Sequence, residues 1–227
     1  MIESLKMGSL NALNSVAWDF ATSPVPEMRA GSNAVVFAEK AVAMTSRTNY
    51  SILDTLAGAY AEAGQFDKAI ATEREAMALL PAGNTNAYFA NCLSIYQSSI
   101  PYRNHDALAE NVKVLLDAGK FVEAEPEARV CLRLREKIIP GVWQTFNAQS
   151  LLGGSLLGQK NYADAEPLLL SGYEGMKQRE HQIPAAGQPR LKEALQRLVQ
   201  LYEATNRSDQ AAKWKHELES ANPSASK

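Results

Sequence analysis

The chain has 227 residues, of which 46% are hydrophobic, so it can bury a sizeable core. It carries 23 basic and 25 acidic side chains, for a net charge of -2. Attraction to nucleic acid or to anionic membranes needs an excess of positive charge, so the sequence predicts neither kind of partner.

The first residues, MIESLKMGSLNALNS, contain no long apolar run and no signal-peptide cleavage site. No stretch reaches the roughly 20 apolar residues that a membrane-spanning helix needs. The two cysteines, Cys92 and Cys131, lack CxxC spacing and are expected to be buried thiols in a reducing compartment. We therefore expect a cytoplasmic protein, with flexible ends at 1–7 and 222–227.

Two amphipathic segments come first, ALNSVAWDFAT at 12–22 and NAVVFAEKAVAMT at 33–45. Pro24 and Pro26 interrupt the helix between them, because proline disfavours helix in the residue before it. The two segments predict a helical hairpin. Ala, Leu, Glu, Lys and Gln dominate the whole chain and no strand-like alternation appears, so the predicted fold class is all-α.

The next unit is more regular: a leucine-rich run, ILDTLAGAYAE, then a turn at Gly64, then FDKAIATEREAMALLP. After it comes TNAYFANCLSIYQ, at 85–97, which has no second helix to pair with. We interpret this segment as a capping helix over the first two hairpins. The irregular stretch around Pro101 then predicts a link between two blocks of hairpins, 8–98 and 105–221.

The turn of the second unit has two later counterparts, AGKFVEAEP and GQKNYADAEP. In each copy an aromatic residue follows the turn and an alanine follows three residues later: Phe66/Ala69, Phe121/Ala124 and Tyr162/Ala165. A final hairpin is predicted in LKEALQRLVQLYEATNRSDQAAKWKHELES. Because one helical hairpin cannot bury its apolar stripe alone, the pattern predicts neighbouring hairpins that stack.

The second hairpin resembles a tetratricopeptide (TPR) repeat. The positions that carry the resemblance are Leu53, Leu56, Ala57, Tyr60, Gly64, Phe66, Ala69, Ala76 and Pro81. Only Glu73, at the second-helix aromatic position, departs clearly from the pattern. The later units are similar to the kinesin-light-chain-like subclass, and the whole chain is similar to arrays that often lie downstream of a Ser/Thr kinase domain in bacterial signalling proteins.

The resemblance implies a right-handed superhelical solenoid of antiparallel hairpins, with about five hairpins and one unpaired helix. In such an array the first helices of the hairpins line a concave groove, which can take a peptide. Asn and Gln side chains there can bond a peptide backbone, although solvated polar side chains would give the same pattern. The residues expected on this side are Asn11, Asn14, Trp18, Asp54, Thr55, Asn147, Ser150, Arg197 and Gln200.

Motifs for catalysis or metal binding are missing from the sequence. His105, His181 and His216 have no partners at metal-ligand spacing, and HExxH, GxSxG and GxxxxGK[ST] do not occur. The carboxylates Glu73 and Glu75 are expected on exposed faces, where nothing raises their pKa. We therefore expect no catalytic residue, no metal site and no cofactor.

These observations predict a non-catalytic scaffold whose groove binds a peptide or partner protein. The alternative is a regulatory or self-assembly segment of a larger bacterial signalling enzyme, such as a Ser/Thr kinase. Either function is compatible with a monomer or a weak homo-oligomer.

Overall fold

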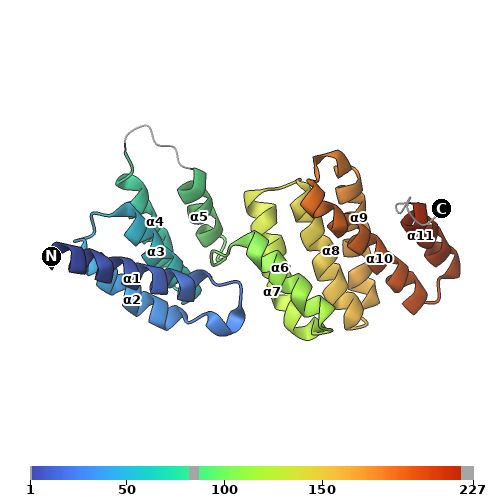
Figure 1. Ribbon diagram of the computed structural model, residues 1–227, viewed down its shortest axis with the longest axis horizontal. Coiled ribbons are helices and arrows are strands. Elements are labelled where there is room, and N and C mark those ends of the chain that lie inside the picture. The colour runs from blue at the N-terminus through green and yellow to red at the C-terminus, as the bar shows by residue number, and fades with distance from the viewer. Residues whose placement is uncertain (1, 82–86, 221–227) are drawn as a thin grey trace. The chain divides into compact units, whose positions relative to one another are not determined.

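The computed structural model describes residues 2–81 and 87–220, with side chains from Ser9 onward. The described residues form an all-α fold, as the composition predicts, with no strand among them (Figure 1). The helices are α1 (Ile2–Thr22), α2 (Gly31–Met44), α3 (Tyr50–Glu62), α4 (Phe66–Ala78), α5 (Ala87–Gln97), α6 (His105–Asp117), α7 (Phe121–Ile138), α8 (Trp143–Gly158), α9 (Tyr162–Lys177), α10 (Gln188–Ala204) and α11 (Ser208–Ser220).

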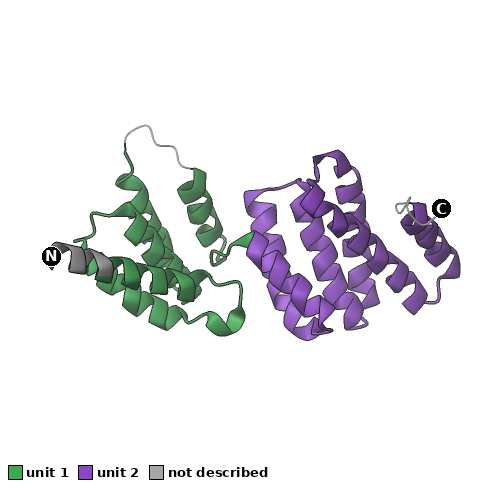
Figure 2. Cartoon of the chain, in the orientation of Figure 1, with its two compact units in different colours: residues 1–105 green, residues 106–227 purple. Residues whose placement is uncertain are grey.

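The chain divides into two compact units (Figure 2). Unit 1 spans residues 1–105 and unit 2 spans residues 106–227. At the N-terminus the structure differs from the expectation of a flexible end at 1–7, because α1 already begins at Ile2. The other expected flexible end, 222–227, lies outside the described residues, as do Thr85 and Asn86 of the predicted capping helix.

Unit 1 is built from two packed hairpins and a single further helix. Helix α1 packs on α2 and α3 packs on α4, while α3 also contacts both helices of the first hairpin. Small residues allow the helices to approach closely: Ala17, Ala38, Ala57 and Ala69 are completely buried. Helix α5 has no hairpin partner and packs against α4.

Unit 2 repeats the hairpin plan. Helix α8 packs on α7 and α9, and α10 packs on α8, α9 and α11. The buried guanidinium of Arg135 joins α7 to α6, because it donates a hydrogen bond of 2.9 Å to Asp106. Gly172 of α9 lies directly against the backbone of α8, where a Cβ would come within 2.7 Å of the amide nitrogen of Ser150.

The turns between helices follow the repeated sequence pattern. Gly64 and Gly119 adopt left-handed backbone angles, with φ of 74° and 72°, two positions before the first residues of α4 and α7. Glycine takes such angles without steric cost. The aromatic residue of each pattern, Phe66, Phe121 or Tyr162, is the first residue of its helix. The repeated turn, aromatic and alanine positions are therefore structurally equivalent.

None of the helices in the described ranges has both the length and the apolar character needed to cross a membrane.

Candidate functional site

In unit 1 the predicted groove residues of α3 are buried. Asp54 is 7% exposed and Thr55 is 3% exposed, so the expectation that they face an open groove is wrong. The Tyr88 hydroxyl of α5 donates a hydrogen bond of 3.2 Å to Asp54 Oδ2, and the Thr55 hydroxyl donates to the backbone oxygen of Ser51. At Asp54 the cause is α5, which brings Tyr88 onto this face of α3.

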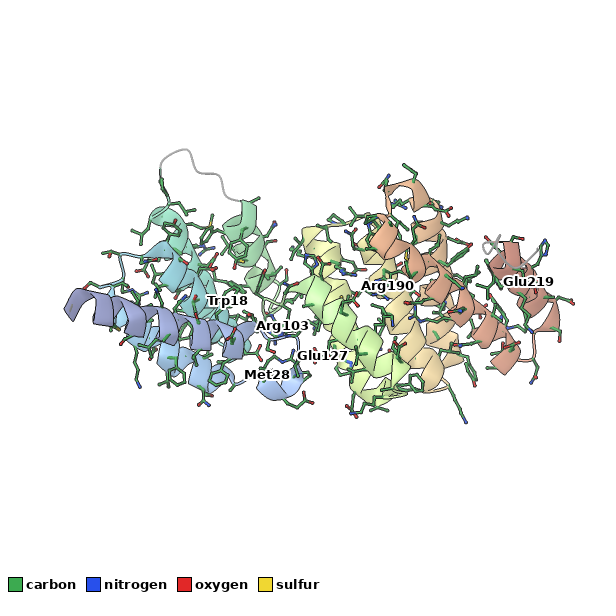
Figure 3. All side chains as sticks on the ribbon, viewed as in Figure 1. Trp18, Met28, Arg103, Glu127, Arg190 and Glu219 are labelled. Carbon is green, nitrogen blue, oxygen red and sulfur yellow. The ribbon has the colours of Figure 1, made fainter. Side chains whose placement is uncertain are left out.

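The predicted residues of α1 differ from one another in exposure. Asn11 is exposed, whereas Asn14 is half-buried and its Oδ1 has no hydrogen-bond partner among the described residues. Trp18 (Figure 3) is half-buried, and its ring lies 5.5 Å from the ring of Tyr102, measured between centroids. The Tyr102 ring in turn lies 5.7 Å from the ring of Tyr88. Trp18 therefore takes part in an aromatic cluster and is not a free groove side chain.

Beneath this aromatic cluster lies a group of buried polar side chains from three helices. We call it the carboxyl cluster and define it as Asp54 of α3, Glu73 of α4, and Cys92 and Tyr96 of α5. One donor atom each from Asp54, Glu73 and Cys92 lie within 4.8 Å of one another. Glu73 and Tyr96 are completely buried, and Cys92 is 1% exposed.

The environment of the carboxyl cluster raises the pKa values of its acids. Burial raises the pKa of Glu73 to about 9, and the nearby charge of Asp54 adds to this effect. Burial also raises the pKa of Asp54 to about 6, although the Tyr88 hydrogen bond opposes the shift. Burial raises the pKa of the Cys92 thiol and of the Tyr96 hydroxyl as well. Burial therefore favours the protonated form of Glu73 more than that of Asp54.

Glu73 is a residue whose surroundings the sequence analysis predicted wrongly. It was expected on an exposed face beside Glu75, but the structure buries it completely, while Glu75 lies at the surface and pairs with Arg47 at 2.5 Å. A signal was present in the sequence, since Glu73 occupies the position where the TPR pattern has an aromatic residue. A carboxyl group at a core position is unusual, because burial of an unpaired charge is costly.

In unit 2 the structure brings predicted residues together. The Arg197 guanidinium of α10 donates a hydrogen bond of 3.0 Å to the Ser150 hydroxyl of α8. Ser150 is completely buried, and Asn147 is 4% exposed. Both were expected to face an open groove, and neither side chain does so. The reason is that Arg197 lies over α8, where Gly154 leaves room for its side chain. Gln200 is exposed.

A cavity of about 250 Å³ opens beside Arg197, and α6, α8 and α10 contribute most of its lining. Arg197 and Gln200 are the predicted residues that line it. The other lining residues are Leu116, Asp117, Phe121, Gly154, Leu157, Gly158, Glu193 and Gln196. The lining combines apolar side chains with amide and charged groups. We call this cavity the α6–α8–α10 cavity.

An ion-pair network that the sequence analysis missed joins two of these helices, α6 and α10. Arg190 of α10 (Figure 3) binds both carboxylate oxygens of Glu110 of α6, at 2.6 and 2.7 Å. Arg190 also binds Glu193, which lies 3.9 Å from Lys113 of α6. Charge-assisted, bidentate contacts of this kind hold two helices in a defined orientation. Sequence spacing could not reveal the Glu110–Arg190 pair, because 80 residues separate its members.

Comparisons with known proteins add no assignment to these observations. No model of a known protein family matches the chain, and no curated protein matches it.

Proposed function

We propose that the chain is a non-catalytic scaffold of the TPR kind that binds a peptide or a partner protein. The observation that carries the proposal is the α6–α8–α10 cavity, which is lined mainly by the first helices of three successive hairpins. In the proposed TPR-like array, these first helices line the concave surface that binds partners. The proposal includes a right-handed solenoid and a cytoplasmic location in a bacterial cell.

The size of the cavity favours a peptide side chain over a whole small molecule. At about 250 Å³ it is smaller than the roughly 300–1,000 Å³ of common small-molecule pockets. Phe121 and Leu157 offer apolar contact, while the amides of Gln196 and Gln200 can donate to and accept from a peptide backbone. An extended segment that inserts one apolar side chain fits this chemistry.

Site-specific photo-crosslinking tests the proposal. A photoreactive amino acid replaces Gln200 at the cavity or, as a control, Gln210, which is exposed on α11 and does not line the cavity. Irradiation in lysate from the source cells should yield a discrete adduct from position 200, to be identified by mass spectrometry. Equal labelling from both positions, or none from position 200, contradicts binding at the cavity.

A charge substitution then tests whether the cavity contributes affinity. Gln196→Lys with Gln200→Lys places two extra charges at the cavity rim and should abolish capture of the crosslinked partner. Gln210→Lys adds charge elsewhere and should leave capture unchanged. Undiminished capture by the double variant would move the binding surface away from this cavity.

The alternative function, self-assembly within a larger signalling enzyme, predicts a different adduct. Crosslinks from position 200 would then join two copies of this chain, and light scattering would show mass increasing with concentration. A heterologous adduct from a monomeric protein contradicts the alternative.

A further inference from the structure

We propose that the carboxyl cluster of unit 1 is a binding site for a divalent transition-metal ion of the zinc class, with Asp54, Glu73 and Cys92 as ligands. The three donor atoms come from three different helices, α3, α4 and α5, and lie within 4.8 Å of one another. Neither the TPR resemblance nor the proposed scaffold function includes such a site.

The first argument is that the cluster contains unsatisfied polar atoms. Apart from the contact between the two carboxyl groups themselves, neither carboxyl oxygen of Glu73 nor Oδ1 of Asp54 has a hydrogen-bond partner among the described residues. The completely buried Tyr96 hydroxyl has none outside the cluster, and it is close enough to the three ligands for their charges to act on it. Buried polar atoms without partners are rare in folded proteins, and each one needs a physical reason. A bound cation would satisfy these oxygens at once.

The second argument concerns charge. In the described part of the chain, no Lys, Arg or His forms an ion pair or hydrogen bond with Asp54 or Glu73. Two carboxyl groups side by side cannot both ionise without a compensating cation, and burial makes their charge more costly still. A divalent ion supplies that compensation.

The third argument is the identity of the donor atoms. A thiolate with two carboxylates is unsuited to Mg²⁺ or Ca²⁺, which prefer oxygen ligands alone. Zinc accepts sulfur and oxygen together, and three protein ligands with a fourth position open are a common arrangement. The Tyr96 hydroxyl or a water molecule would occupy the fourth position.

The geometry allows the site to close. Metal–ligand distances of about 2.0–2.3 Å place the ligand atoms of a tetrahedral site roughly 3.2–3.8 Å apart. The three donor atoms are up to 4.8 Å apart in the structure, so the side chains would move inward by on the order of 1 Å to bind the ion. Such a site would tie the unpaired α5 to the second hairpin.

Cobalt titration of the full-length protein tests the proposal, because Co²⁺ replaces Zn²⁺ and absorbs light characteristically when a thiolate binds it. The protein is first treated with a chelator and a reductant, and then titrated with Co²⁺ after both are removed. We expect one Co²⁺ per chain, a thiolate-to-cobalt charge-transfer band, and loss of the band when Zn²⁺ is added. A protein that shows no band, and whose melting temperature Zn²⁺ does not raise, would overturn the proposal in favour of a carboxyl pair that shares a proton.

Cys131 provides the matched control, since it is a second buried cysteine but lies in α7 of unit 2. Cys92→Ser should lose the charge-transfer band, whereas Cys131→Ser should keep it. Glu73→Gln retains the shape of the side chain and should weaken Co²⁺ binding by roughly 100-fold or more, the upper end of losses reported for outer-shell partners. Circular dichroism confirms that each variant is folded; a band that survives in folded Cys92→Ser or Glu73→Gln contradicts the assignment.

Discussion

At the scale of single residues, the surroundings of a side chain decide its chemistry more than its residue type. Glu73 and Glu166 show this. Glu73 is completely buried, and its pKa is raised to about 9, whereas the hydrogen bonds of Arg207 hold the pKa of Glu166 below its ordinary value. The two glutamates therefore have opposite preferences for a proton in the folded state.

The Glu166 contacts predict an effect of pH on stability. Arg207 binds both carboxylate oxygens of Glu166 at 2.8 Å, and the Tyr202 hydroxyl donates to Oε1 at 2.9 Å. A pKa lowered by folding stabilises the protein above the unfolded value near 4.5, and this stabilisation is lost as the pH falls through the folded-state pKa. Glu166→Gln should therefore lower the urea midpoint at neutral pH, and this effect should disappear as the pH falls through the lowered folded-state pKa of Glu166.

Glu174→Gln is the control for this prediction, because Glu174 is exposed on the same helix. Its effect on the midpoint should be smaller at every pH. If Glu166→Gln lowers the midpoint equally in acid and at neutral pH, the loss comes from packing and not from the charge.

At the scale of helices, close approach depends on small residues. Gly172 of α9 is the clearest case, because the backbone of α8 lies directly against it. A Cβ there would lie 2.7 Å from the amide nitrogen of Ser150 and 2.9 Å from the carbonyl oxygen of Phe146. Because backbone atoms cannot move aside, Gly172→Ala should destabilise unit 2 by about 1–3 kcal/mol. Equilibrium unfolding in urea measures this difference.

At Gly58 of α3, in contrast to Gly172, substitution by alanine is expected to stabilise the protein. The nearest atoms to its added Cβ would be Tyr96 Oη and Trp18 Cζ3, at 3.6 and 3.7 Å, which is ordinary contact. Gly58→Ala should therefore stabilise the protein by roughly 0.4–1 kcal/mol, because it reduces the freedom of the unfolded chain. A loss of stability would show that this part of α3 has less space than the structure gives it.

Ala69 tests the contact between the two helices of a hairpin. It is completely buried in α4, and a larger side chain there would force α3 and α4 apart. Ala69→Leu should cost about 1–3 kcal/mol of unfolding free energy. Ala71 lies two residues away on the exposed face of α4, so Ala71→Leu should change stability by less than about 0.5 kcal/mol.

At the scale of the whole molecule, the division into two compact units predicts independent folding. Each unit has its own buried residues, from Ala17 to Ile100 in unit 1 and from Leu108 to Trp214 in unit 2. Fragments 1–105 and 106–227 should each give a helical circular dichroism spectrum and a cooperative thermal transition. A fragment that lacks a cooperative transition would show that its unit needs the other one to fold.

The sequence alone was sufficient for the all-α fold and for the repeated hairpin positions. Helix-forming residues, the left-handed turns at Gly64 and Gly119, and alanines three residues after each aromatic act within one hairpin, so local spacing reveals them. Arg197 and Gln200, which the sequence analysis assigned to the groove side, line the α6–α8–α10 cavity. The peptide-binding role of these residues stays a prediction.

Only the tertiary structure decided which polar residues are buried. Asp54 and Glu73 are charged residue types that usually lie in solvent, and Cys92 is a small apolar one. They become a cluster because α5 packs against α4 and its Tyr88 covers Asp54 of α3. Helix α5 begins 14 residues after Glu73 in the chain. Burial is a property of what covers a side chain, and here the covering element is distant in sequence, so the chemistry of the cluster follows from packing and not from periodicity.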